Sequence, residues 1–533
     1  MIELTNCHFV YMDENKTDNK GKINFNHLDI TNLNLLMEDI IISDTLNQGN
    51  LMHLALTDHS GFNIFHMAGL LEFSKKHINA RSLKILSNSS SLNLNLQFSF
   101  NHFKSFNHFV DSVNIDAQFM NSKVSMNDIA FFAPALEGMN STVNLSGRVA
   151  GFVSDLRAGN MLMESGDNTR MFFDLSMKGL PDFEHTQIHF DLKNSTVKMA
   201  DLDEFSLPGG EKLNLSARFN AISTARVTAQ FDGSILDFSA DIVAETDNGF
   251  IKANVNSKGK SPEQIYHGKV MVDGFDMSTV AGLESKLGNV SGNITFNGKG
   301  TNKYNYSVKA DGSITSLFYN NYVYTGISID GNVKPSLYEG EVFINDPNII
   351  LDFDGLIDYS GRHPVLDFIA TIEESNLKAL HFNRNDSNAW LSCIIDANVT
   401  GLNPDSMLGK IKINNLAYDE GMKSFRITFL NTSITEKDSI SKLIAVNSEV
   451  FNGEIEGVFS FKDIGETVQK YLSVYIPSFI NYEETDEELQ PLAFNYRFTF
   501  KNVQDVLDVF APGLKISKNT IASGSFDSGK NYL

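Results

Sequence analysis

The sequence is poor in cysteine, in proline and in long apolar runs. It has 533 residues with 11 prolines and two cysteines, Cys7 and Cys393, and it contains no CxxC motif. Without Cys/His ligand spacing, a structural zinc site is excluded. We expect both cysteines to be small core residues, with a disulfide between them as the alternative. No apolar run approaches the roughly 18–20 residues of a membrane-spanning helix.

Basic residues are also scarce. The chain has 43 Lys and Arg against 65 Asp and Glu, which gives a formal net charge of −22. Nucleic-acid binding needs a basic face that neutralises phosphates, so nucleic acid is not an expected partner. The same balance argues against tight contact with an anionic membrane surface. Self-repulsion of this size keeps a protein soluble.

No targeting segment is recognisable at the start of the chain. Residues 1–6 contain neither a basic segment nor an apolar core, which alone would indicate a cytoplasmic protein. The last residues, 529–533, lie within a strand-like pattern. We therefore expect a piece of a longer protein, with its targeting and anchoring segments outside this sequence.

The dominant pattern is an alternation of apolar and polar residues. It runs without a fault through 92–100 and 494–500. Alternate side chains of a strand point to opposite faces, so each run has an apolar and a polar face, which is typical of antiparallel sheet. The apolar members of these two runs are the candidate groove-lining residues: Leu92, Leu94, Leu96, Phe98, Phe100, Phe494, Tyr496, Phe498 and Phe500.

Turn signals and short helical segments divide the chain into repeated units. Asn, Asp and Gly are frequent, and pairs such as Asp330-Gly331 favour tight turns between strands. Short amphipathic segments at 126–132, 464–474 and 503–510 predict helices. Some precede a Pro or Gly break and a strand that opens near Ser-Gly, as in 132–149 and 510–526, so we infer an internal repeat.

The repeat predicts a mainly β fold: an elongated, curled antiparallel sheet whose apolar side chains line a groove. The alternative is that those side chains pack in the core of an ordinary β-sandwich. The expected plan is an N-terminal β-meander at 1–125, repeat units with short helices at 126–288, a β-groove repeat region at 289–500, and the start of a further repeat at 501–533.

Two motifs with possible chemistry are set aside. Gly524–Lys530 matches the start of a phosphate-binding loop, but Asn531 stands where the magnesium-binding Ser or Thr is needed. Three histidines lie close in sequence, but their neighbours alternate, so a shared metal ion is not expected: His53, His59 and His66.

The acidic run Glu483–Glu488 lacks the spaced oxygen ligands of a calcium loop, and we interpret it as a solvated loop. No Ser/His/Asp set stands in a recognisable motif. The sequence therefore predicts no catalytic residue, no cofactor and no metal site.

From about residue 289 the order of the motifs resembles that of a known family, the TamB-like translocation and assembly module proteins of the Bacteroidota type, in the AsmA superfamily. The earlier segments 145–151 and 179–182 are similar to the same family. Each motif by itself carries little information, and the order of the motifs is the more specific feature. The motifs that carry the resemblance are Val290–Gly300, Ile344–Asn348, Leu351–Asp358, Pro364–Ala370, Asn376–Leu380 and Gly409–Leu416.

The resemblance implies a periplasmic β-groove in a protein anchored in the inner membrane, with a C-terminal segment that meets an Omp85-type outer-membrane partner. It also implies kinship with bridge-like lipid-transfer proteins, whose groove carries acyl chains. We therefore expect a non-enzymatic module for lipid transport between the two membranes, for translocation and assembly of outer-membrane proteins, or for both. Phospholipid acyl chains and unfolded outer-membrane proteins are the expected partners, and membrane contact is expected through segments outside this chain.

Two other classes share the alternating pattern. An outer-membrane β-barrel should have evenly long strands of about 9–11 residues, whereas most clean runs here are shorter. A secreted β-sandwich adhesin would seal its apolar faces as cores.

Overall fold

The computed structural model describes residues 1–14, 22–133, 136–206, 209–212, 214, 222–278, 286–300, 304–382, 388–438, 440–476 and 491–529. They form a mainly β protein with 28 strands and a few short helices. The chain divides into two units. The first comprises residues 1–260 and 264–284, and the second comprises 261–263 and 285–533.

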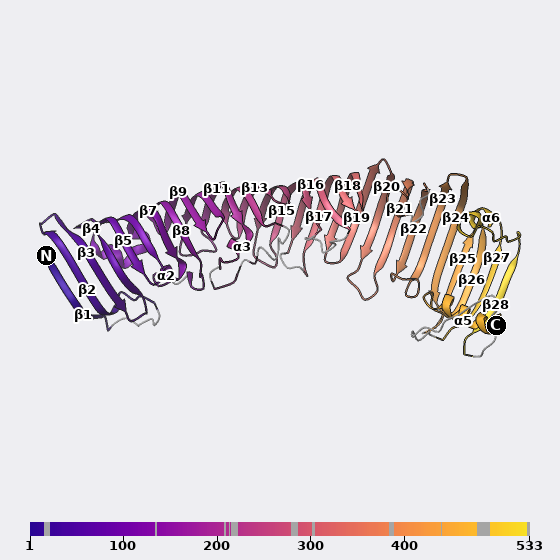
Figure 1. Cartoon of the computed structure of the whole chain (residues 1–533), viewed down its shortest axis with the longest axis horizontal. Helices are drawn as coiled ribbons and strands as arrows, with labels where there is room; N and C mark the ends of the chain where they lie inside the picture. Colours follow the sequence, from indigo (N-terminus) through magenta and orange to yellow (C-terminus); the bar gives the residue numbers. More distant parts are fainter. Residues whose placement is uncertain are drawn as a thin grey trace. The chain divides into compact units, whose positions relative to one another are not determined.

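The first unit is an antiparallel meander. Each strand pairs with its neighbours in sequence, and Figure 1 shows the strands side by side in chain order. The strands are β1 (Ile2–Met12), β2 (His27–Ile41), β3 (Leu46–Asp58), β4 (Asn63–Ser74), β5 (His77–Ser87), β6 (Ser91–Phe100), β7 (Val113–Ser125), β8 (Thr142–Phe152), β9 (Asp155–Ser165), β10 (Thr169–Lys178), β11 (Gln187–Lys198), β12 (Thr224–Ser234), β13 (Asp237–Thr246), β14 (Gly249–Lys258) and β15 (Ile265–Asp276).

The second unit repeats the same arrangement, and the sheet in each unit is open. Its pairs are again antiparallel and consecutive. The strands are β16 (Leu287–Lys299), β17 (Ser307–Tyr319), β18 (Tyr322–Lys334), β19 (Leu337–Asp346), β20 (Ile349–Asp358), β21 (Val365–Asn376), β22 (Trp390–Thr400), β23 (Leu408–Glu420), β24 (Lys423–Glu436), β25 (Lys442–Ser448), β26 (Phe451–Val458), β27 (Ala493–Phe500) and β28 (Ile521–Asp527).

Short helices lie between some strands. The three helices predicted from the sequence are confirmed as α2, α5 and α6, with small differences at their ends. A further aromatic segment between β6 and β7 is helical although the sequence pattern did not predict it. The helices are η1 (Phe103–His108), α1 (Phe109–Ser112), α2 (Met126–Ala130), α3 (Met199–Leu202), α5 (Ile464–Tyr475) and α6 (Gln504–Phe510).

The strands are longer than the clean alternating runs, because β-bulges interrupt the alternation without ending the strand. In β7 the buried side chains before the bulge are Val113 and Ala117, whereas those after it are Ser122, Val124 and the last residue, Ser125. The extra residue, Asn121, has a left-handed φ of 48°. Asn tolerates this conformation better than other residues with a side chain. The bulge therefore shifts the buried face from odd-numbered to even-numbered residues, so that Val113 and Val124 lie on the same face of the strand.

Equivalent bulges recur along the first unit. At four of these bulges the backbone N–H of the left-handed residue donates to a side-chain oxygen of the neighbouring strand, so this N–H keeps a hydrogen bond although it leaves the ladder. The donor and acceptor pairs are Asn6 to Asn34 Oδ1 (2.9 Å), Ser82 to Asn95 Oδ1 (2.8 Å), Asn121 to Ser146 Oγ (2.9 Å) and Asn160 to Asp174 Oδ1 (2.6 Å). The frequent asparagines thus serve bulges within strands as well as the predicted turns.

We expect Asn121→Val to destabilise the first unit by about 1–2 kcal/mol, because a β-branched residue is strained at a left-handed φ. The matched variant Asn121→Gly accepts this conformation without a Cβ and is expected to lose less than half as much. Urea unfolding of both variants, followed by circular dichroism, measures the difference. Equal stability of the two variants would contradict the assigned bulge.

Candidate functional site

Strand register in the second unit aligns apolar side chains into rows that cross many strands. One row runs through seven consecutive strands, β18 to β24, with each residue opposite the next. We call the surface that carries this row the apolar face of the second unit. The row consists of Ile329, Val342, Phe353, Ala370, Ile395, Ile413 and Leu430.

The opposite surface of the same strands is polar. Asp330, Glu341 and Asp354 stand opposite one another on β18, β19 and β20, and all three are exposed. Exceptions are Phe343 and Ile369, which are apolar and 42% and 54% exposed on this polar face. The sheet therefore has one apolar face and one polar, solvent-exposed face, as the alternation predicted.

The first unit has the same two-sided character. One buried hydrophobic cluster of this unit is formed by Ala80, Leu83, Leu94 and Ala117, which come from the consecutive strands β5, β6 and β7. Leu92 and Leu96 pack against this cluster and Leu94 belongs to it, so the alternating run of β6 has its predicted common face.

The structure places the nine candidate groove residues on two strands. Leu92, Leu94, Leu96, Phe98 and Phe100 lie on β6, in the first unit. The other four lie on β27, in the second unit: Phe494, Tyr496, Phe498 and Phe500. The two groups belong to separate units, and each shares its surface with many apolar residues that the sequence patterns did not single out.

Aromatic side chains of η1 and α1 cover part of the β6 face. The rings of Phe98 and Phe106 have centroids 6.2 Å apart, and those of Phe98 and Phe109 are 5.7 Å apart. Phe100 contacts Phe103 and Phe106, with centroids 5.1 Å and 5.0 Å away. Phe98 and Phe100 are therefore packed by the chain itself, whereas Leu96 packs beside the buried cluster and is half-buried.

Helix α5 similarly covers one end of the β27 face. Tyr471 of α5 packs with Phe494 of β27 and Phe526 of β28 in one buried cluster. Tyr496 and Phe498 continue along β27 and are half-buried. Helices thus cover the ends of strands, while Ile329 and Val342 of the apolar row pack beside the buried cluster that contains Leu380 and stay half-buried.

No second sheet packs on the apolar rows among the described residues. The hydrophobic clusters join side chains from consecutive strands and from the segments at strand ends. Face-to-face packing of two sheets would bury such rows completely. Instead, Ile329, Val342 and Phe353 are only half-buried, so the sandwich-core interpretation does not fit the second unit.

The surface area supports the same conclusion. The accessible surface of the chain is 30782 Å². Two separate close-packed domains that shared the mass equally would together expose about 23,000 Å². Few large apolar side chains are fully buried in the part of the chain that is described; they are Leu83, Leu380, Leu492, Val113 and Val143.

Two of the three neighbouring histidines meet in the structure. The Nδ1 atoms of His53 on β3 and His66 on β4 are 2.8 Å apart, and their rings stack with centroids 5.1 Å apart. His59 lies 3.6 Å from the carboxylate of Asp58 instead. Within the described ranges, no group of three or more His, Cys, Asp or Glu could hold a metal ion.

The other motifs set aside from the sequence have ordinary positions or fall outside the described residues. Residues 524–527 belong to strand β28, and no phosphate-loop helix follows within the described chain, which ends at residue 529. The acidic run Glu483–Glu488 lies outside the described residues.

Both cysteines are free thiols in the structure. Cys393 lies on β22 and is 5% exposed, and burial raises the pKa of its thiol. Cys7, on β1, is half-buried. A buried thiol with a raised pKa forms little of the reactive thiolate.

We expect iodoacetamide at neutral pH to modify Cys7 at least about tenfold faster than Cys393 in the folded protein. In urea the two rates should converge, because the burial of Cys393 is lost. Peptide mass spectrometry over a time course measures both rates. Rapid modification of Cys393 in the folded chain would show that β22 is less protected than its burial indicates.

The described part of the chain contains no helix that is long and apolar enough to cross a membrane. The fold and site define an open antiparallel meander with one apolar face. Comparison with known proteins adds nothing further: no protein-family model, no curated protein and no solved structure matches the chain.

Proposed function

We propose that this chain is a non-enzymatic periplasmic module that holds phospholipid acyl chains on its apolar face and moves them between the inner and outer membranes. The observation that carries the proposal is the apolar row from Ile329 to Leu430, which crosses seven strands without a covering sheet and is half-buried at every position except the buried Ala370. In this proposal the anchor in the inner membrane belongs to other parts of a longer protein.

The energetics favour such an occupant. Each methylene that leaves water contributes roughly 0.8 kcal/mol, so an acyl chain needs no special residue to bind an apolar surface. A row of Ile, Val, Phe and Leu side chains makes apolar contact with an acyl chain, and this contact does not require the fixed geometry of hydrogen bonds. Binding of this kind is insensitive to position along the row, which suits a ligand that slides from strand to strand.

Lipid extraction of the purified full chain tests this proposal. We expect native mass spectrometry to find phospholipid bound after purification without detergent, and delipidated protein to take up phospholipid from vesicles. A chain that stays empty in both experiments would contradict the proposal. The polar control is glycerol phosphate, the head group without acyl chains, which is not expected to bind the apolar face.

A second candidate function uses the same face for a protein client. An unfolded outer-membrane strand also alternates, so its apolar side chains could cover the rows that Val342 and Phe353 expose. This candidate includes delivery to an Omp85-type outer-membrane partner. A synthetic alternating peptide that displaces bound phospholipid would support it, whereas a peptide with the same composition in scrambled order should not compete.

A further inference from the structure

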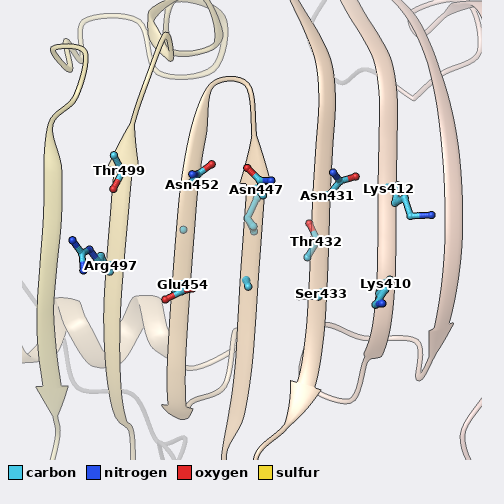
Figure 2. A pocket seen from close by; sticks show the side chains of 13 residues that line it. Lys410, Lys412, Asn431, Thr432, Ser433, Asn447, Asn452, Glu454, Arg497 and Thr499 are labelled. Atoms are coloured by element: carbon cyan, nitrogen blue, oxygen red, sulfur yellow. The ribbon is translucent and has the colours of Figure 1, made fainter.

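The polar face of the second unit contains a hollow of about 550 Å³ on strands β23 to β27. Figure 2 shows Lys410 and Lys412 on one strand at one side of this hollow, and Arg497 and Thr499 on another strand at the opposite side. Apart from Glu454 on β26, the strands between them carry short polar or small side chains. Those that form the floor are Asn431, Ser433, Ala445, Asn447 and Asn452.

Strand register makes this floor regular. Asn431 is opposite Asn447, Asn447 is opposite Asn452, and Asn452 is opposite Thr499. The ladder begins at Lys412, which is opposite Asn431. An amide ladder of this kind presents hydrogen-bond donors and acceptors at each strand, in contrast to the apolar face of the same strands.

The hollow is basic although the chain is strongly acidic. Three cations, Lys410, Lys412 and Arg497, line it together with one carboxylate, Glu454. Lys412 pairs with Asp396 outside the hollow at 2.7 Å. Within the described residues, Lys410 and Arg497 have no ion pair, and both are exposed.

A fourth cation stands beside the floor. The Nζ atom of Lys501 donates to Asn452 Oδ1 at 2.8 Å and to the carbonyl of Ser448 at 2.6 Å. Its charge therefore lies next to the Arg497 side of the hollow. Cations stand at both sides, and the side chains between them are neutral except Glu454, which is opposite Arg497 on the neighbouring strand. This arrangement favours an elongated ligand that carries more than one negative group.

We propose that this hollow binds a short acidic saccharide, with its carboxylates at Lys410 and Arg497 and its hydroxyl groups on the asparagine ladder. Four strand spacings separate β23 from β27, or roughly 19 Å at about 4.8 Å each, which suits an oligosaccharide better than a single phosphate. Arg offers a planar pair of donors to a carboxylate, and Lys offers a compact point charge. This site lies on the polar face and does not depend on lipid binding.

Calorimetric titration of the full chain with a short oligogalacturonate, which carries one carboxylate per sugar, tests the proposal. We expect one site per chain, and we expect the affinity to fall at least tenfold in Lys410→Gln/Arg497→Gln. The affinity should also fall as salt is raised, because the cations are exposed to solvent. Neutral dextran oligomers and inorganic phosphate are the comparison probes, and both should bind at least tenfold more weakly.

The control variant is Lys309→Gln/Lys334→Gln, which removes two exposed lysines from the polar face of β17 and β18, outside the hollow. It should bind the oligogalacturonate like the unchanged chain. Circular dichroism of both variants reports whether the sheet is intact. Absence of binding, equal loss in both variants, or equal binding of dextran would overturn the proposal.

Discussion

The double variant Val342→Asp/Phe353→Lys should slow phospholipid transfer between vesicles by at least about tenfold. The two residues are opposite each other on β19 and β20, and they are the second and third residues of the apolar row. An acyl chain that crosses this point would have to remove water from both charges, which costs several kcal/mol. Since 1.4 kcal/mol corresponds to a factor of ten, a modest part of this cost is sufficient for the expected effect.

The charges are chosen so that the sheet itself tolerates them. Oppositely charged residues directly across an antiparallel pair attract each other, so strand pairing is expected to persist. Both original side chains are half-buried, and Val342 packs at the margin of the buried cluster of Tyr324, Ile327 and Leu380. Thermal unfolding of the variant checks that transfer is lost without loss of the fold.

A matched control lies on the other side of the same two strands. Phe343→Asp/Leu356→Lys introduces the same charges on the polar face of β19 and β20, where Phe343 is already 42% exposed. We expect this variant to transfer phospholipid at the normal rate. Equal slowing by the two double variants would mean that net charge, and not the apolar face, controls transfer.

Leu83→Ala should destabilise the first unit by about 3 kcal/mol, because deletion of a buried leucine side chain leaves a cavity. Leu83 is 1% exposed and packs with Ala80, Leu94 and Ala117. This cluster is among the few fully sealed parts of the described sheet. Urea unfolding, together with hydrogen exchange of β4 to β7, measures the loss.

The control for this prediction is on the same strand. Leu86 of β5 is 46% exposed, opposite His66. Leu86→Ala should change the free energy of unfolding by less than about 0.5 kcal/mol. If the two alanine variants were equally stable, the cluster would not be the core of this unit.

Local sequence patterns predicted the local elements well. The alternation at 92–100 and 494–500 specified the two faces of β6 and β27, and helical spacing at 464–474 and 503–510 located α5 and α6. Consecutive turn signals predicted the meander, because short connections place neighbouring strands side by side. These features depend on residues close in sequence.

Bulges and strand register were not predictable in the same way. The left-handed residue Asn121 looks like a turn residue in the sequence, and only the continued pairing of β7 with β8 shows it to be a bulge. The apolar row from Ile329 to Leu430 arises from six separate registers, each set by its own hairpin. The covering of Phe98 by the η1 aromatics likewise depends on how a connection folds back.

The basic hollow could not be predicted from the sequence, for a similar reason. Lys410 and Arg497 are 87 positions apart, and an overall charge of −22 conceals a local excess of cations. Three intervening strands, with their hairpins and α5, bring the two residues to one surface.

Photocrosslinking compares neighbouring positions on opposite faces and tests the lipid account most directly. A photoreactive residue would replace Leu96 or Phe353 on the apolar faces, and Gln97 or Asp354 as their exposed neighbours. After illumination with phospholipid vesicles, we expect lipid adducts at Leu96 and Phe353 and none above background at Gln97 and Asp354. Equal labelling of both faces, or no adduct at either apolar position, would contradict acyl-chain binding by this sheet.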